Sequence, residues 1–79
     1  MINQLDFLVF DKNTISDVIQ VTFDMGDENT KKREIKGLIE ACKNFDLKSG
    51  TIITFDSEDE LIENRIKIKI IPFYKWSII

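Results

Sequence analysis

The chain has 79 residues, enough for one small domain that buries only about 60% of the surface exposed by its unfolded chain. Eleven basic and fourteen acidic residues give a net charge of −3, which disfavours a domain that binds nucleic acid mainly by neutralising phosphates. With one cysteine, no histidine and no apolar run of the roughly 20 residues needed to span a bilayer, we expect a single cytoplasmic domain over residues 1–79, without a disulfide.

Two runs of alternating hydrophobicity open the chain and predict a β-hairpin. They cover residues 5–10 and 17–23, and the polar sequence DKNT between them suits a turn. If the odd-numbered apolar residues of both strands share one face of the sheet, directly opposed residues must both have odd or both have even numbers. A five-residue loop over residues 11–15 meets this condition. The expected pairs are Asp6 with Gln20, Leu8 with Val18, and Phe10 with Ser16.

An amphipathic helix is predicted for about residues 28–45. Asp27 suits its N-cap, because a carboxylate there can accept a hydrogen bond from an exposed backbone N–H. The basic run KKREIK either forms solvated surface or contacts phosphates. Apolar side chains recur on one side of this helix at helical spacing: Ile35, Leu38, Ile39, Cys42 and Phe45. We therefore expect this side to face the core, with the lone cysteine buried there.

Two further strands are predicted after the helix. TIITFD, residues 51–56, is nearly continuously apolar, whereas RIKIKII, residues 65–71, alternates isoleucine with basic residues. The acidic connector DSEDELIEN between them suits a hydrated turn or, alternatively, a Ca²⁺ loop. The tail PFYKWSII predicts a turn or a short helix, whose Tyr74 and Trp76 either pack against the sheet or stack on bases.

These elements predict an α+β fold in the order β-β-α-β-β, with a small mixed sheet and one main helix on one face. We expect the helix to cover the face of Ile19, Val21 and Phe23. An apolar patch then remains on the other face, and it needs a second copy, another protein or the folded-back tail to cover it. The patch consists of Leu8, Phe10 and Val18.

The succession LDFLVF, VIQVTFD, KKREIKGLIEACKNFDLKSGTIITFD and IKIKIIPFYKW resembles the C-terminal, PD-(D/E)XK nuclease-like domain of archaeal and bacterial AAA-type ATPases. The similarity covers nearly the whole chain and implies a truncated restriction-endonuclease-like core. No GxxxxGK(S/T) motif accompanies it, so the ATP site of those ATPases is missing from this sequence.

The resemblance also implies a vestigial site on the hairpin. In PD-(D/E)XK enzymes an Asp and a Glu or Gln on adjacent strands hold a divalent metal, and a Lys two residues later helps to activate water. These positions match Asp6 and Gln20 as metal ligands, which suit Mg²⁺, and Thr22 in place of the lysine. Thr22 cannot supply the charge of a lysine. Alternatively, Gln20 and Thr22 form a solvated strand face and Asp6 has a structural role.

Three functions follow from these observations. The favoured one is a non-catalytic accessory module without a cofactor, which self-associates or pairs with an ATPase partner. The second is a Mg²⁺-dependent DNA nuclease whose site is degenerate or shared between chains. The third is a nucleic-acid-binding module, which would use the basic helix together with the strand face of Lys67 and Lys69.

Overall fold

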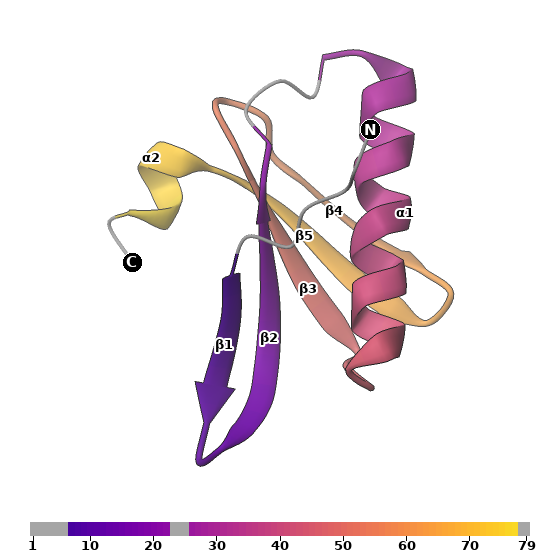
Figure 1. Cartoon of the computed structure of the whole chain (residues 1–79). Helices are drawn as coiled ribbons and strands as arrows, with labels where there is room; N and C mark the ends of the chain where they lie inside the picture. The colour runs from indigo at the N-terminus through magenta and orange to yellow at the C-terminus, as the bar shows by residue number, and fades with distance from the viewer. Residues whose placement is uncertain (1–6, 23–25, 78–79) are drawn as a thin grey trace.

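The computed structural model describes the backbone of residues 7–22 and 26–77, and the side chains of 12–22 and 26–77. It has the predicted α+β fold, with one long helix on one face of a small mixed sheet (Figure 1), but the sheet has five strands where the sequence predicted four. None of the described helices is long and apolar enough to cross a membrane. The elements are β1 (Phe7–Asp11), β2 (Thr14–Val21), α1 (Glu28–Asn44), β3 (Ser49–Thr54), β4 (Asp59–Glu63), β5 (Ile66–Pro72) and α2 (Phe73–Trp76).

The strands lie in the order β1-β2-β3-β5-β4. The inner strands β2, β3 and β5 run parallel to one another, while β1 and β4 pair antiparallel with their neighbours at the two edges. Two adjacent parallel strands need a long crossover connection, and α1 supplies it between β2 and β3. We call the side of the sheet that α1 covers the helix face, and the opposite side the far face.

Helix α1 begins and ends within one residue of the predicted bounds. Asp27 is its N-cap residue, but its side chain makes no capping hydrogen bond to the backbone. The carboxylate of Asp27 instead accepts a hydrogen bond from the Thr30 hydroxyl at 3.1 Å. The predicted capping bond is therefore wrong, although the predicted position of the helix start is confirmed.

The acidic connector between the last two predicted strands contains a strand of its own, so the prediction of a hydrated turn is wrong. Strand β4 pairs antiparallel with β5, and Leu61 lies opposite Ile68 and packs against the core. Asn64 and Arg65 form the connection with φ angles of 54° and 65°, the left-handed region that two-residue hairpin turns require. Leu61 is therefore the residue by which this largely acidic strand packs against the core.

The hairpin of β1 and β2 has a tighter turn than predicted. Lys12 and Asn13 form it, with φ angles of 52° and 70°, in place of the expected loop over 11–15. The pairing of Leu8 with Val18 is confirmed. The pairing of Phe10 with Ser16 is wrong, because the register shifts after Val9 and leaves Phe10 opposite Ile15. The expected pair of Asp6 with Gln20 lies outside the described residues.

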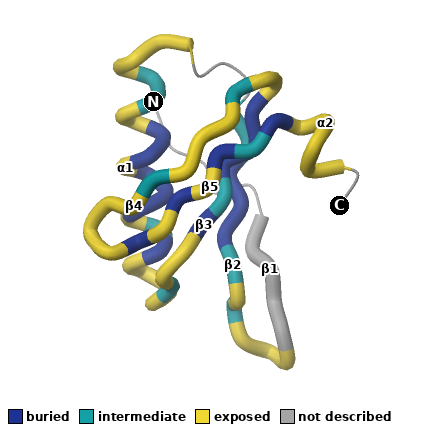
Figure 2. Tube along the Cα trace, turned by 180° about the vertical axis from the view of Figure 1, so that it is seen from behind, coloured by how far each residue is buried: buried dark blue, intermediate teal, exposed yellow. Residues whose placement is uncertain are grey.

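The core between α1 and the sheet contains Val18, so the predicted placement of the helix on the face of Ile19, Val21 and Phe23 is wrong. Val18 is fully buried and cannot belong to the predicted interface with Leu8 and Phe10, whose side chains lie outside the described residues. Figure 2 shows the buried residues along the inner strands and one side of α1. The buried core cluster is Val18, Ile35, Leu38, Ile39, Cys42, Ile52, Ile66, Ile68 and Ile70.

Gly50 allows β3 to approach α1 closely. A Cβ atom at this position would lie 3.0 Å from both Cys42 Sγ and Leu38 Cγ, which is tighter than ordinary contact. Cys42 is fully buried, as predicted for a core residue, and burial, together with the nearby charge of Asp17, raises the pKa of its thiol to about 11. The cysteine thus stays protonated and packs as a small apolar side chain.

Candidate functional site

A buried polar pair links the middle of the sheet to the helix. Gln20 lies on β2 at the helix face and is 2% exposed, while Glu34 lies on the side of α1 that meets the sheet and is 8% exposed. The Gln20 amide nitrogen donates hydrogen bonds to the Glu34 carboxylate and, at 3.2 Å, to the Glu34 backbone carbonyl. A neutral amide and a carboxylate therefore satisfy each other where neither is open to bulk water.

The structure describes two of the three residues of the predicted vestigial site, Gln20 and Thr22. Gln20 does not lie on a solvated face, so that alternative is wrong for this residue. Thr22 is partly exposed and continues the sheet, since its backbone N–H donates to the Ile53 carbonyl at 2.8 Å. Asp6 lies outside the described residues.

Glu34 is the residue that the sequence analysis missed. It interrupts the basic run KKREIK, and it lies one residue before Ile35 and four before Leu38, both on the buried stripe of α1. An acidic residue at that helical position faces the sheet and needs a partner there. The sequence therefore contained a signal for the Gln20–Glu34 pair, in the phase of the helix.

The described residues do not fit a Mg²⁺ site around Gln20. They supply one amide and one carboxylate, already hydrogen-bonded to each other, and Mg²⁺ normally keeps several water ligands. In the part of the chain that the structure describes, no three His, Cys, Asp or Glu side chains are grouped so that they could hold a metal ion. The pair has the features of a structural bridge between β2 and α1.

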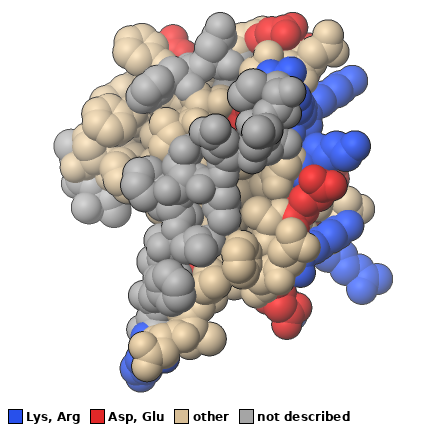
Figure 3. All heavy atoms as spheres, in the orientation of Figure 1, with Lys and Arg blue, Asp and Glu red and all other residues tan. Residues whose placement is uncertain are grey.

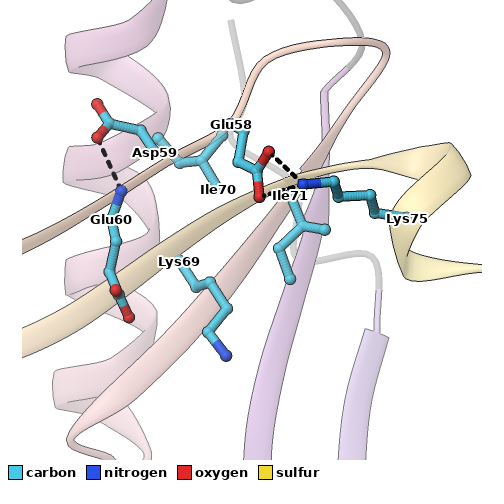
Figure 4. Close-up of a pocket in the computed structure, with 7 residues that line it drawn as sticks. All are labelled: Glu58, Asp59, Glu60, Lys69, Ile70, Ile71 and Lys75. Atoms are coloured by element: carbon cyan, nitrogen blue, oxygen red, sulfur yellow. Dashed lines mark hydrogen bonds and ion pairs between the residues drawn. The ribbon is translucent and has the colours of Figure 1, made fainter.

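A hollow of about 830 Å³ lies beside β4, β5 and the short helix α2. Figure 4 shows Lys75 of α2 directed toward Glu58, with its Nζ 2.8 and 3.0 Å from the two carboxylate oxygens. Glu60 and Lys69 are directly opposed on the neighbouring strands, and they project to the same side as Ile71. The hollow therefore has an apolar floor and a rim of both charges.

A smaller hollow of about 200 Å³ contains Asp17, Lys67 and Lys69 among its lining residues. Burial raises the pKa of the Asp17 carboxyl above its ordinary value, whereas the Val18 N–H, which donates to it at 2.8 Å, and the charge of Lys69 act in the opposite direction. Asp17 is thus a half-buried acid, whereas Gln20 on the same strand is buried and Thr14 and Ser16 are exposed.

The basic residues do not form one continuous patch. Lys67 and Lys69 lie on the far face, whereas α1 covers the helix face, so the two groups of basic residues named for nucleic acid lie on opposite sides of the sheet. Lys31 pairs with Asp59 at 3.2 Å and Lys67 pairs with Glu60 at 3.0 Å. In Figure 3, basic side chains line the side where α1 lies, with acidic ones between them.

Aromatic side chains gather where β3 and β5 end. Thr54 and Pro72 are paired, so Phe55 and Phe73 follow directly from adjacent strand positions. We call Phe55, Phe73, Tyr74 and Trp76 the aromatic end; they are 67%, 48%, 60% and 39% exposed. The prediction that Tyr74 packs against the sheet is therefore wrong, while Trp76 lies beside Phe73 with 6.3 Å between the ring centroids.

The fold and these features define a small α+β domain with a buried amide–carboxylate bridge and an exposed aromatic end. The chain matches no protein-family model, no curated protein and no solved structure. The resemblance to PD-(D/E)XK nuclease-like domains stays a prediction from the sequence.

Proposed function

We propose that the chain is a non-catalytic, nuclease-like accessory module that acts in the cytoplasm by binding another protein, with an AAA-type ATPase as the expected partner. The observation that carries this proposal is the aromatic end, where four large rings are more than a third exposed. Aromatic side chains are enriched at the centres of protein interfaces, because each removes a large apolar area from water at little entropic cost.

The surroundings of the aromatic end support this role. The ion pair of Glu58 with Lys75 lies next to it, and the side chains of that pair are 54% and 48% exposed. An apolar centre with a solvated polar border is the usual anatomy of a protein interface. Burying one exposed ring contributes roughly 1.5–3 kcal/mol, so two or three rings can supply a large share of a stable association.

The Gln20–Glu34 bridge supports the absence of catalysis. The residue that the resemblance assigns to a metal ligand is 2% exposed and donates to a carboxylate. Separating the pair while both groups stay buried would leave each without its partner, at a cost of about 1–3 kcal/mol for each group. The position has the features expected of a structural residue.

A titration with an AAA-type ATPase whose own nuclease-like domain has been deleted tests the proposal. Trp76 is the only tryptophan of the chain, so its emission reports on the aromatic end. We expect a blue shift on binding, and we expect Phe55→Ser to weaken binding by about tenfold or more. Lys43→Ser, at an exposed position on α1, is the matched control and should leave the affinity unchanged.

A metal-dependent nuclease is the second candidate, because the Glu34 carboxylate lies beside Gln20 and adds an acidic group that the sequence analysis did not assign. We expect no cleavage of DNA or RNA in Mg²⁺ or Mn²⁺. Metal-dependent cleavage that disappears in both Asp6→Ala and Gln20→Ala would replace the proposed function with this one.

A further inference from the structure

The two edges of the sheet differ in how they are protected from pairing with another chain. Strands β1 and β4 occupy the edges (Figure 1), and no other described strand lies outside either of them. An edge strand presents unpaired backbone N–H and C=O groups, which makes it a template for a further strand. Natural sheets commonly block such edges with charged side chains.

Strand β4 carries this protection. Its sequence DELIE contains three acidic residues in five positions. Asp59 and Glu60 also form ion pairs with Lys31 and Lys67, at 3.2 and 3.0 Å, which keep lysine side chains beside the edge. Two β4 strands brought together would place their carboxylates close to one another, so this edge opposes association with its own copy.

Within the described residues, the sequence of strand β1 supplies no such charged protection along most of its length. Its sequence is FLVFD, with a single charge at the end next to the turn. On the inner side β1 pairs with β2 from Phe7 to Asp11, so the backbone is already held in an extended conformation. A pre-formed, uncharged edge strand can accept a partner strand without the entropic cost of ordering it.

We propose that β1 pairs antiparallel with β1 of a second copy of this chain, so that two five-stranded sheets join into one across a two-fold axis. The axis is perpendicular to the sheet, so both α1 helices lie on the same face of the joined sheet. Odd-numbered residues of one β1 then lie opposite odd-numbered residues of the other, and even-numbered opposite even-numbered. Centred on Val9, this register places Leu8 opposite Phe10 of the second copy and Phe7 opposite Asp11. No like charges oppose each other in it.

Charge also selects the second copy over an open chain of molecules. Pairing β1 with β4 of another copy would place its apolar run against an acidic strand and would leave one free edge at each end. Pairing β1 with β1 uses the unprotected edge twice and leaves only the two protected β4 edges exposed. The assembly therefore closes as a dimer and does not grow. This inference is independent of the aromatic end.

Val9→Lys tests the inference, with Ile62→Lys on the other edge strand as its matched control. Val9 is paired with Asp17 within the chain, so a lysine there has a carboxylate nearby and the hairpin is retained. Ile62 is 73% exposed on β4 and tolerates the same change. Because a five-residue strand pair buries less than the roughly 1,200 Å² of a standard interface, we expect a weak, concentration-dependent dimer.

In sedimentation equilibrium, wild type and Ile62→Lys should give the same dimer constant, and Val9→Lys should weaken it by about tenfold or more at unchanged far-UV circular dichroism. If Val9→Lys unfolds, hydrogen exchange of the wild type decides: protection of β1 amides must rise with protein concentration. A wild-type monomer at all concentrations, growth beyond a dimer, or a dimer that Val9→Lys leaves intact would overturn the inference.

Discussion

Strands β2 and β5 flank the central strand β3 and both alternate polar with apolar residues, yet β2 presents a polar side chain to α1 whereas β5 presents only apolar ones. In β5 Ile66, Ile68 and Ile70 face the helix, and Lys67 and Lys69 lie exposed on the far face, as predicted. In β2 the polar Gln20 faces the helix beside Val18, and Ile19, at 9% exposed, lies on the far face. The alternation shows which residues share a face, and it does not show which face is buried.

The difference has a physical cause in the helix. A buried lysine would need a buried acid and would lose its hydration, which is costly even when the charge is paired. A neutral amide costs far less to bury once it is hydrogen-bonded, and Glu34 accepts from Gln20 at the point where α1 crosses β2. Gln20 therefore points inward at a position where α1 offers it a hydrogen-bond partner.

The largest expected effect comes from breaking that partnership. Gln20→Leu and Glu34→Leu each leave one buried polar group without its partner, and we expect each to lower the free energy of unfolding by about 1–3 kcal/mol. The double variant removes both groups, so we expect its loss to be clearly smaller than the sum of the two single losses. Urea unfolding followed by far-UV circular dichroism measures all three.

Glu40→Gln is the control for the Gln20–Glu34 cycle, because Glu40 is exposed on the same helix. Its unfolding free energy should stay within about 0.5 kcal/mol of wild type. Additive losses in the double variant would show that Gln20 and Glu34 do not stabilise each other, and the explanation given for the inward side of β2 would then be wrong.

Much of the fold was predictable because its signals are local. The buried stripe of α1 and the alternation of β5 each involve one element. The alternation is confirmed, and so is the stripe for Ile35, Leu38, Ile39 and Cys42, whereas Phe45 follows the last helical residue and is 37% exposed, so its predicted burial is wrong. The face of β2 depends on Glu34, fourteen residues away in sequence. Strand β4 was not predicted, because an acidic segment with one inward-facing apolar residue, Leu61, has no clear strand pattern. The role of Leu61 is defined by its pairing with β5, a contact between two elements.

The candidate site was predictable only in part for the same reason. The resemblance identified Gln20 and Thr22, but it could not show that the Gln20 amide is held by Glu34. The exposure of the aromatic end depends on how α2 leaves the sheet after Pro72, and the composition of the tail does not specify that direction. The burial of Gln20 and the exposure of the aromatic end both depend on contacts between elements, which a pattern within one element does not contain.

A smaller effect on the free energy of unfolding is expected at Asp17, a polar residue of β2 that lies on the far face of the sheet. Its pKa is raised above the ordinary value of 3.8, chiefly because of burial. The folded state therefore binds this proton more tightly than the unfolded state, so the stabilisation is present at low pH and is lost as pH rises through the raised pKa. At pH 7 Asp17→Asn should stabilise the fold slightly, by less than about 1 kcal/mol.

Chemical unfolding of wild type and Asp17→Asn across pH 3–7 checks this expectation. The difference between the two should grow as the pH rises above 3.8 and level off once the folded carboxyl is ionised. The side-chain oxygen of an asparagine can still accept a hydrogen bond from the Val18 N–H, so this contact is preserved in the variant. A difference that is independent of pH would show that burial does not control this carboxyl.

The smallest effect is expected on β5, where the polar residues face outward. Lys67→Met removes the ion pair with Glu60, whose nitrogen and oxygen are 3.0 Å apart and whose side chains are 55% and 52% exposed. Exposed pairs of this kind gain little, because water and salt screen the charges and two long side chains must be ordered. We expect a loss below about 0.5 kcal/mol, shrinking further in 0.5 M salt, since methionine keeps most of the apolar stem. A loss as large as that of Gln20→Leu would mean that the outward lysines of β5 are as structurally important as the inward glutamine of β2, and the contrast between the two strands would disappear.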